Sequence, residues 1–548
     1  MRKFLTLFCL LGVLVPAAAG KPSPKLPDNI YFRAMQDEMK RTLQELRAKD
    51  SPNPYYVAYK LMRTVYWEKD TSFGELYPSS EAPQTRLDAL VLLGIGSDKS
   101  DQLGFASDHF YYEPQFIKSV PNSYEGIRRA LWERTNAEYL AASDAYVQKQ
   151  AYKRQKALPD TLPDVTPAPQ AAVFEDAGEF SLPDMKKWEE TVKKLSAKGK
   201  DLSWIENFTV SFKIEREETY YLNSLGGAYQ IPFTKTDLKL KARFRNQDGY
   251  LQEAEDTIQL AGFDAPDEKA LEEKTDAFLV DAAQMYNAYK AEAYLGPVLF
   301  RPAAAAQFVQ QQFVWNVENV KPLLSNRYEN DESSGLFRDK KGMRVISNVV
   351  DVIDKPLLRE YQGKPLVFMP VDDEGVPSQN LQLTSQGRLR VLPQTRRPLG
   401  ENHQSNGHAR MNFYTYPRES LTNTFVEPKM PLSEKELEEE FLAVCQDWEL
   451  EYCYQIDVYE NINGSLVNRA WRVYAQDGRK VPAFGLDLRN LYSRSLRDII
   501  AAGDDKEVIY FQRAYGPSTI VSPSLLLEEI EILPSDVKPD KPPFIDKP

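Results

Sequence analysis

The chain has 548 residues, and 80 acidic against 68 basic side chains give it a formal charge of −12 at pH 7. Nucleic-acid binding requires a basic surface, so this balance argues against a nucleic-acid partner. The length suggests two to four domains of roughly 150 residues each.

Residues 1–19 have the composition of an export signal. Arg2 and Lys3 precede the apolar run FLTLFCLLGVLV, and Ala17 and Ala19 provide small side chains for cleavage. The run is shorter than the roughly 20 apolar residues that span a bilayer, and no later segment is long and apolar enough to do so. We therefore predict an exported chain, periplasmic or secreted, with no membrane span.

Residues 20–154 are predicted to form an α+β segment. It begins with an amphipathic helix that has Asp28 as a possible N-cap. The apolar face of this helix consists of Phe32, Met35, Met39, Leu43 and Leu46. Strands are expected over residues 55–71 and 88–98, and a long helix over residues 123–158. The Pro/Ala-rich stretch 155–181 is typical of a linker or loop.

Residues 182–292 are predicted to complete the N-terminal region. They contain helical patterns over residues 183–198 and 267–292, with strands over residues 207–227 and 236–252 between them. From residue 293 to residue 535, turn sequences such as VDDEGVPSQ and ENINGS multiply, which favours antiparallel strands. Residues 536–548 are typical of a Pro/Lys-rich tail. We therefore expect an α+β fold, in which an α+β N-terminal region precedes a mainly antiparallel-β C-terminal domain.

Two cysteines lie outside the export signal, Cys445 and Cys453. Eight residues along one helix span about 12 Å, which is too far for a disulfide. The thiols could meet if a helix ended near Trp448 and a strand began at Cys453. The spacing favours two unpaired thiols and leaves the disulfide open.

Histidine is scarce, and the chain contains only His109, His403 and His408. His403 and His408 lie close together in sequence and could hold a metal ion with Asp372 or Glu374 of the DDEG segment. Gly-containing sequences of this kind more often form solvated turns, which is the favoured interpretation. On a strand, the neighbouring Asp372 and Asp373 would point to opposite faces, so they do not make an acid–base pair unaided.

Several segments of the second half together resemble one known family. They are YLGPVLFRPAAAAQFV, PVDDEGVPSQNLQLTSQGRLR, SNGHAR, PRESLTNTFVEP and VSPSLLLEEIEIL. They are similar to the segments that mark TldD/PmbA proteins, including D-D-E-G-V-P and S-T-G-N-A-R, although PRESLTNTFVEP has two extra residues before its T-N-T. That family comprises zinc-dependent peptidases and their non-catalytic sister subunits. The resemblance is specific from about Gly296 to Leu533 and diffuse before that.

Catalytic members of the family carry H-E-x-x-x-H on the helix that follows the GPVL segment. The two imidazoles bind zinc, and the glutamate takes a proton from the metal-bound water. In this chain the ungapped register places Gln310, Gln311 and Trp315 at those positions. A glutamine amide is a weak zinc ligand and no base, and an indole nitrogen can only donate. The family's late thiolate ligand also has no match, so the resemblance implies no catalytic residues and no zinc cofactor here.

A plainer interpretation places Gln310, Gln311 and Gln312 on the solvent face of an amphipathic helix. The buried stripe of that helix would be Phe308, Val309, Phe313, Val314 and Val317. The two interpretations differ only over whether the glutamine face lines a cavity.

The leading hypothesis is a non-catalytic, peptide-binding subunit that pairs with a zinc-bearing paralogue or with itself. By the resemblance, the residues expected to face the cleft and position a peptide substrate are Asp372, Asp373, Glu374, Asn406, His408, Arg410 and Arg418. One alternative is an active metallopeptidase with zinc relocated to His403, His408 and Asp372 or Glu374. Another is a structural or assembly protein of the cell envelope that keeps only the scaffold.

Overall fold

The computed structural model describes residues 25–539 apart from short internal segments. Those segments are residues 50, 79–81, 104, 107–114, 118, 159–162, 177, 179–184, 261–265, 319–323, 326–334, 399–402, 412–416, 462–464, 489 and 514–515. The predicted export signal and His109 therefore lie outside the described residues. Among the helices that are described, none is long and apolar enough to cross a membrane.

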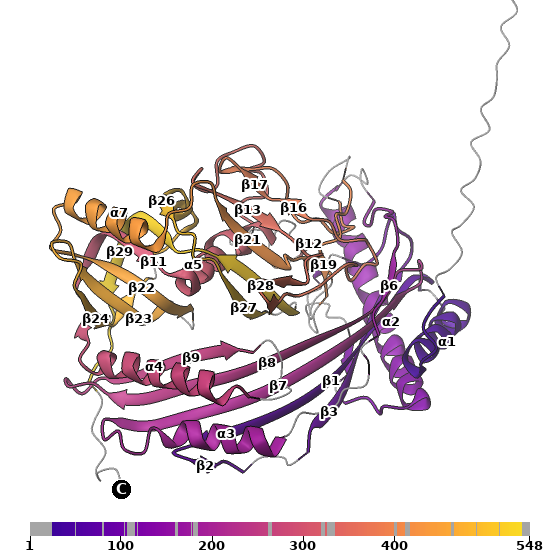
Figure 1. Ribbon diagram of the computed structural model, residues 1–548. Helices are drawn as coiled ribbons and strands as arrows, with labels where there is room; N and C mark the ends of the chain where they lie inside the picture. The colour runs from indigo at the N-terminus through magenta and orange to yellow at the C-terminus, as the bar shows by residue number, and fades with distance from the viewer. Residues whose placement is uncertain are drawn as a thin grey trace, which may run out of the picture.

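One long, curved sheet forms the base of the N-terminal region (Figure 1). Its main path runs through β5 (Gln115–Ile117), β3 (Gln84–Ile95), β1 (Pro54–Ser72), β7 (Ile205–Asn223), β8 (Ala228–Arg245) and β6 (Ala172–Phe174). In addition, β2 (Glu75–Leu76) pairs with β1, and β9 (Leu251–Gln259) pairs with β8. Buried and half-buried residues alternate along β7, which is the period of a strand with one face on a core. Because β6 lies within the stretch 155–181 and pairs with β8, the segments on both sides of that stretch share one sheet.

Four helices accompany this sheet, α1 (Ile30–Glu45), α2 (Tyr124–Gln155), α3 (Met185–Ala197) and α4 (Glu268–Tyr286). Figure 1 shows α1 and α2 at one end of the sheet and α3 and α4 at the other. The N-cap of α1 is Asn29, whose side chain accepts a hydrogen bond from the N–H of Phe32, so the expected cap Asp28 was wrong. Asn29 has the extended backbone of a cap residue and directly precedes the first helical residue.

The C-terminal domain contains two larger sheets in its described part. The first follows the order β10 (Tyr289–Lys290), β24 (Lys480–Phe484), β23 (Ser465–Tyr474), β22 (Tyr452–Asn461), β11 (Tyr294–Phe300), β29 (Leu525–Pro534) and β25 (Leu486–Asp487), and β26 (Ile499–Ala502) pairs with β29. The second follows the order β16 (Leu381–Gln382), β13 (Val350–Asp354), β21 (Asn423–Pro428), β28 (Gly516–Ser522) and β27 (Glu507–Arg513). Most pairings are antiparallel, so the predicted α+β class with a mainly antiparallel second domain is confirmed.

Shorter ladders and helices complete the molecule. Four two-stranded ladders join β4 (Phe105–Ala106) with β12 (Leu324–Ser325), β14 (Glu360–Tyr361) with β15 (Lys364–Pro365), β17 (Thr384–Ser385) with β18 (Arg388–Leu389), and β19 (Ala409–Arg410) with β20 (Arg418–Glu419) in the described residues. The helices are α5 (Pro302–Val309), the π-helix η1 (Gln310–Val314), α6 (Trp315–Glu318), α7 (Glu434–Asp447) and the 3₁₀ helix η2 (Ser493–Arg497).

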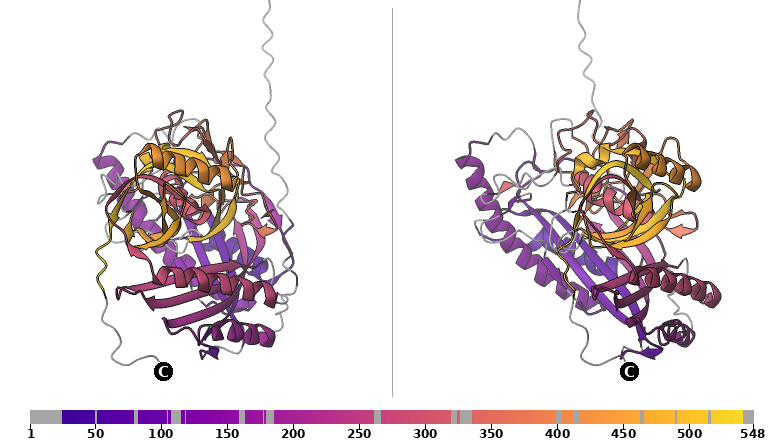
Figure 2. Two further views of the ribbon diagram at one scale, coloured as in Figure 1. Left: turned by 60° about the vertical axis from the view of Figure 1, so that its left-hand side comes forward. Right: turned by 90° about the vertical axis from the view of Figure 1, so that its left-hand side faces the viewer.

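The strands of the C-terminal domain curve around α5 (Figure 2). Three of its four alanines, Ala304, Ala305 and Ala306, are fully buried, and their small side chains let the surrounding strands approach the helix closely. The predicted apolar stripe is confirmed, since Phe308, Val309, Phe313, Val314 and Val317 all have 0% exposure. The helix that carries the three glutamines is therefore central to the core of this domain.

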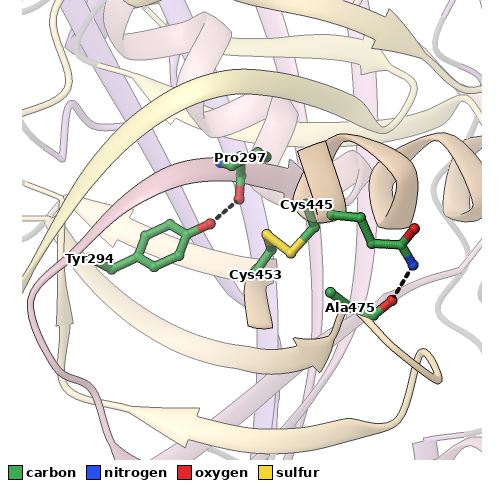
Figure 3. Close-up of a disulfide and its surroundings, with 6 residues drawn as sticks. Tyr294, Pro297, Cys445, Cys453 and Ala475 are labelled. Carbon is green, nitrogen blue, oxygen red and sulfur yellow. Dashed lines mark hydrogen bonds between the residues drawn. A yellow bond between two sulfur atoms is a disulfide. The ribbon is translucent and has the colours of Figure 1, made fainter. Parts of the chain in front are cut away.

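A disulfide joins Cys445 in α7 to Cys453 in β22 (Figure 3). The helix ends at Trp448 and the strand begins at Tyr452, so the chain reverses between the cysteines and brings their Cα atoms to 6.0 Å. The favoured expectation of unpaired thiols was wrong, because the eight-residue spacing is not spanned by one helix. The reversal is held by Gln446, whose side chain donates to the carbonyl of Ala475 at 2.6 Å.

Replacing both cysteines, as Cys445→Ala/Cys453→Ala, should lower the free energy of unfolding of the C-terminal domain by about 2–3 kcal/mol. That is the loss expected when a short loop is no longer closed in the unfolded chain. Thermal and urea unfolding, followed by far-UV circular dichroism, would measure it. A reductant should then destabilise the wild type and leave the double variant unchanged. An equal effect of reductant on both proteins would contradict the disulfide.

Candidate functional site

A cavity of about 620 Å³ lies between the long sheet of the N-terminal region, called the first sheet from here on, and the C-terminal domain. The sheet contributes residues of β1, β3, β7 and β8, and the other wall comes from residues 365–369, from Arg410 and Met411, and from the facing ends of β27 and β28. The volume falls in the range of roughly 300–1,000 Å³ that is usual for ligand sites. The walls are mainly apolar, with a few charged groups among them.

A buried ion pair joins the two domains beside this cavity. Lys60 on β1 reaches Asp373, with Nζ 2.9 and 3.1 Å from the two carboxylate oxygens. The hydroxyl of Tyr229 and the N–H of Met411 also donate to Asp373. Asp373 is completely buried and Lys60 is 8% exposed, so water screens this pair little.

The DDEG segment forms the predicted turn, and Asp372 holds that turn together. The turn was expected to be solvated, and this was wrong, because it packs against the sheet of the N-terminal region and leaves Asp372 and Asp373 with 0% exposure. One oxygen of Asp372 accepts from the N–H groups of Glu374 and Val376, at 2.9 and 2.8 Å, and the other accepts from Ala409 at 3.0 Å. Burial raises the pKa of the Asp372 carboxyl well above its ordinary value. Burial also raises the pKa of Glu374 to about 7, while the nearby Arg396 opposes that rise.

The turn is packed directly on the first sheet. Gly375 has φ of +80°, and a Cβ there would lie 2.2 Å from the side-chain oxygen of Gln170. The carbonyl of Gly375 accepts from the N–H of Ala171, and the carbonyl of Glu374 accepts from the side chain of Asn223. Only glycine fits this left-handed position so close to a neighbouring strand.

Both ring nitrogens of His408 are engaged by acceptors. Nδ1 lies 3.0 Å from the carbonyl oxygen of Asn406, and Nε2 lies 3.1 Å from a carboxylate oxygen of Asp354. A carbonyl cannot donate, and the Asp354 carboxylate also accepts from the N–H of Thr422. Both ring nitrogens of this buried histidine are therefore occupied by partners within the protein, so neither is free to bind a metal ion.

The structure gives no support to a relocated zinc site. The other histidine, His403, has Nε2 at 2.6 Å from the carbonyl of Thr395. Asp372 is occupied by its three backbone donors. In the described part of the chain, no group of three His, Cys, Asp or Glu side chains is arranged to hold a metal ion.

The helix positions at which the resemblance expects zinc ligands carry the wrong chemistry for zinc. Gln310 and Gln311 lie half-buried on η1, and Trp315 is 54% exposed at the start of α6. The side-chain oxygen of Gln310 and the side-chain nitrogen of Gln311 are buried without a hydrogen-bond partner. None of the three residues lines the cavity. π-helical turns often mark functional positions, and here one carries these glutamines.

The expected cleft residues occupy different places. Arg410 lines the cavity. Asp373 does not line it but forms an ion pair with Lys60, which does. The other residues that do not line it are Asp372, Glu374, Asn406, His408 and Arg418. The side chain of Asn406 donates to the carbonyl of Leu392 and accepts from the N–H of Gln394. Arg418 on β20 is the cross-strand partner of Arg410 on β19.

Sequence reasoning did not select the residues that the first sheet adds to the cavity, notably Lys60, Glu217 and Tyr229. Each lies in a long strand whose polar positions resemble an ordinary solvated face. Burial raises the pKa of the Glu217 carboxyl, and the hydroxyl of Thr219 donates to it at 2.8 Å. No local sequence signal marks these side chains, because the second domain covers them from a distant part of the chain.

Where β8 borders the cavity, no strand of the described residues pairs with one of its edges. β6 pairs with residues 228–230, and β9 pairs with residues 237–245. On this edge the carbonyls of Gln230 and Thr236 accept from Glu175 and Leu260. Since outward groups alternate along a strand, the C=O of Pro232 and both backbone groups of Thr234 face outward too. No described residue is bonded to them, and both Pro232 and Thr234 line the cavity.

The Asp373→Asn substitution should destabilise the protein by about 3–5 kcal/mol, because it leaves the Lys60 ammonium buried without its counter-charge. Glu215→Gln breaks the more exposed Lys213–Glu215 pair and should cost less than about 1 kcal/mol. Thermal unfolding of both variants at matched pH would measure the difference. Equal and small shifts would show that the pair does not join the domains.

Comparison with known proteins supports both the fold and the family. The family model of the PmbA/TldA metallopeptidase C-terminal domain matches residues 293–533 of this chain. TldE from Thermococcus kodakarensis is similar in structure, with a TM-score of 0.59 and 15% identity over 91% of this chain and 100% of that one. No curated protein sequence matches the chain.

Two further solved structures share the fold. A candidate modulator of DNA gyrase from Thermotoga maritima has a TM-score of 0.57 and 15% identity over 87% of this chain and 96% of its own. One from Bacteroides thetaiotaomicron has a TM-score of 0.58 and 12% identity over 92% of this chain and 98% of its own. The family model shows that residues 293–533 form a C-terminal domain of the PmbA/TldA metallopeptidase type, and the three solved structures, all of proteins described as TldE or DNA gyrase modulators, show that nearly the whole chain shares their fold.

Proposed function

We propose that this protein is an exported, non-catalytic member of the TldD/PmbA family. It binds extended peptides and acts with a zinc-bearing paralogue that supplies the peptidase chemistry. The observation that carries the proposal is the helix α5–η1–α6, on which Gln310, Gln311 and Trp315 stand where the catalytic relatives are expected to hold zinc.

The glutamine helix supports a non-catalytic role through the chemistry of its side chains. An amide neither binds zinc well nor accepts a proton at neutral pH, and an indole offers no lone pair. The helix keeps its buried face and its place in the core, so the scaffold persists without the reactive groups.

The cavity supports peptide binding. The outward groups of Pro232 and Thr234 offer two acceptors and one donor on a strand edge. An extended peptide can pair with such an edge through its own backbone, whatever its sequence. Apolar walls on either side, including Phe233 and Leu366, can take side chains of the peptide.

The disulfide supports export. Cys445 and Cys453 are both fully buried, and structural disulfides of this kind persist in oxidising compartments. The export signal expected over residues 1–19 agrees with the same location.

The purified mature protein should contain far less than one zinc per chain, measured by elemental mass spectrometry before and after incubation with zinc and desalting. It should also show no peptidase activity alone. His408→Ala serves as the control and should leave the zinc content unchanged. About one zinc per chain, lost in His408→Ala, would overturn the non-catalytic assignment and locate a new metal site at that histidine.

Thr234→Pro should weaken binding of an unstructured peptide by roughly 3- to 10-fold, because it removes one outward N–H and hence one backbone hydrogen bond. Proline already occupies the neighbouring outward position, Pro232, so the strand can accommodate it. Thr234→Ala is the matched control, since it keeps the N–H and loses only the side chain. Fluorescence anisotropy with a labelled peptide would measure both, and equal affinities would exclude the β8 edge as the binding site.

A further inference from the structure

The cations that line the cavity differ in their partners. They are Lys60, Arg359, Arg410 and Arg513. All but one form a direct ion pair, with Asp373, Glu175 and Glu318 respectively for Lys60, Arg359 and Arg513. In the described part of the chain, Arg410 alone among them has no carboxylate within 4.0 Å.

Arg410 is nevertheless deeply buried, with 7% exposure. One terminal nitrogen contacts the sulfur of Met369 at 2.6 Å, and the other donates to the hydroxyl of Thr422 at 2.7 Å. A thioether is a weak acceptor, and a guanidinium carries five N–H donors. Arg410 therefore keeps donor capacity that the protein itself does not use well.

The nearby carboxylates do not form hydrogen bonds with the remaining N–H donors of Arg410. Asp372, Asp373 and Asp354 act on Arg410 only through space. Asp373 is paired with Lys60, Asp354 with His408, and Asp372 with backbone N–H groups. A buried charge without a direct partner is costly, so this position favours an anion supplied from the cavity.

We propose that Arg410 is the carboxylate-binding residue of the cavity and that it holds the C-terminal carboxylate of the bound peptide. The inference rests on the peptide binding proposed above. The planar fork of a guanidinium matches the two oxygens of a carboxylate, with parallel N–H···O bonds. Because Arg410 is the only one of these four cations without a direct carboxylate partner among the described residues, the cavity suits a monoanion better than a phosphate.

The C-terminus is the source of carboxylate that fits the rest of the cavity. Pairing with the β8 edge uses only the peptide backbone and therefore selects no side chain. The carboxylate that every peptide carries on its backbone is the terminal one. The β8 edge would bind the peptide backbone, and Arg410 would bind the carboxylate at its C-terminal end. Together they would recognise a peptide by its C-terminus.

The test compares one labelled peptide as the free acid and as the C-terminal amide, with anisotropy titrations against the full mature protein. The free acid should bind at least about tenfold more tightly than the amide, as expected for a charge-assisted hydrogen bond. In Arg410→Gln this ratio should fall to near one through loss of affinity for the acid. Arg390→Gln, an exposed arginine of the same domain outside the cavity, should keep the wild-type ratio.

Each outcome has a separate meaning. If neither peptide binds the wild type, peptide binding itself fails. If acid and amide bind equally well, peptide binding stands and the role of Arg410 is overturned. If an internal glutamate restores the affinity of the amide, the terminal assignment is overturned in favour of an acidic side chain. Should Arg410→Gln not fold, Arg410→Lys keeps the charge without the fork, and it should lose part of the wild-type ratio.

Discussion

The contact of Asp373 with Lys60 is the interaction on which the arrangement of the two domains depends. The partners are 313 residues apart, and the pair is buried between β1 and the turn of the second domain. Next to this pair, backbone N–H groups donate to Asp372 and hold it in the turn. The carbonyls of Glu374 and Gly375 in the same turn accept hydrogen bonds from Asn223 and Ala171 of the N-terminal region. Met369, Val371 and Met411 extend this joint by packing into the hydrophobic core of the first sheet. The cavity exists because the second domain is fixed over the sheet at this point and leaves space further along β8.

Much of the fold could be predicted from local patterns. The period of the helix after the GPVL segment predicted a buried stripe, and Val314 and Val317 are buried as expected. The DDEG composition predicted a solvated turn; the structure contains the turn but buries it between the domains, which local composition does not reveal. The disulfide was not favoured, because a spacing in sequence does not show where a helix stops. A single reversal between Trp448 and Tyr452 decided it.

The site could be predicted only in part, and the reason is the distance over which it is assembled. Arg410 was expected in the cleft by resemblance and lines the cavity. Lys60 and Tyr229 were not expected, since their burial comes from a domain that follows them by more than a hundred residues in the chain. His408 and Asn406 belong to the same loop as Arg410 but point their polar atoms at neighbouring backbone or at Asp354. Chain proximity in a loop does not make its residues share a surface.

The open edge of β8 also bears on how the protein avoids association with other folded sheets. A free strand edge on a surface is a template for intermolecular pairing, and natural proteins commonly protect it. Here β6 and β9 cap the two ends of the gap, Pro232 removes one donor, and the ends of β27 and β28 form the opposite wall. Among the described residues, this part of the β8 edge therefore faces a recess that the C-terminal domain covers, and not the open surface where two folded sheets would pair.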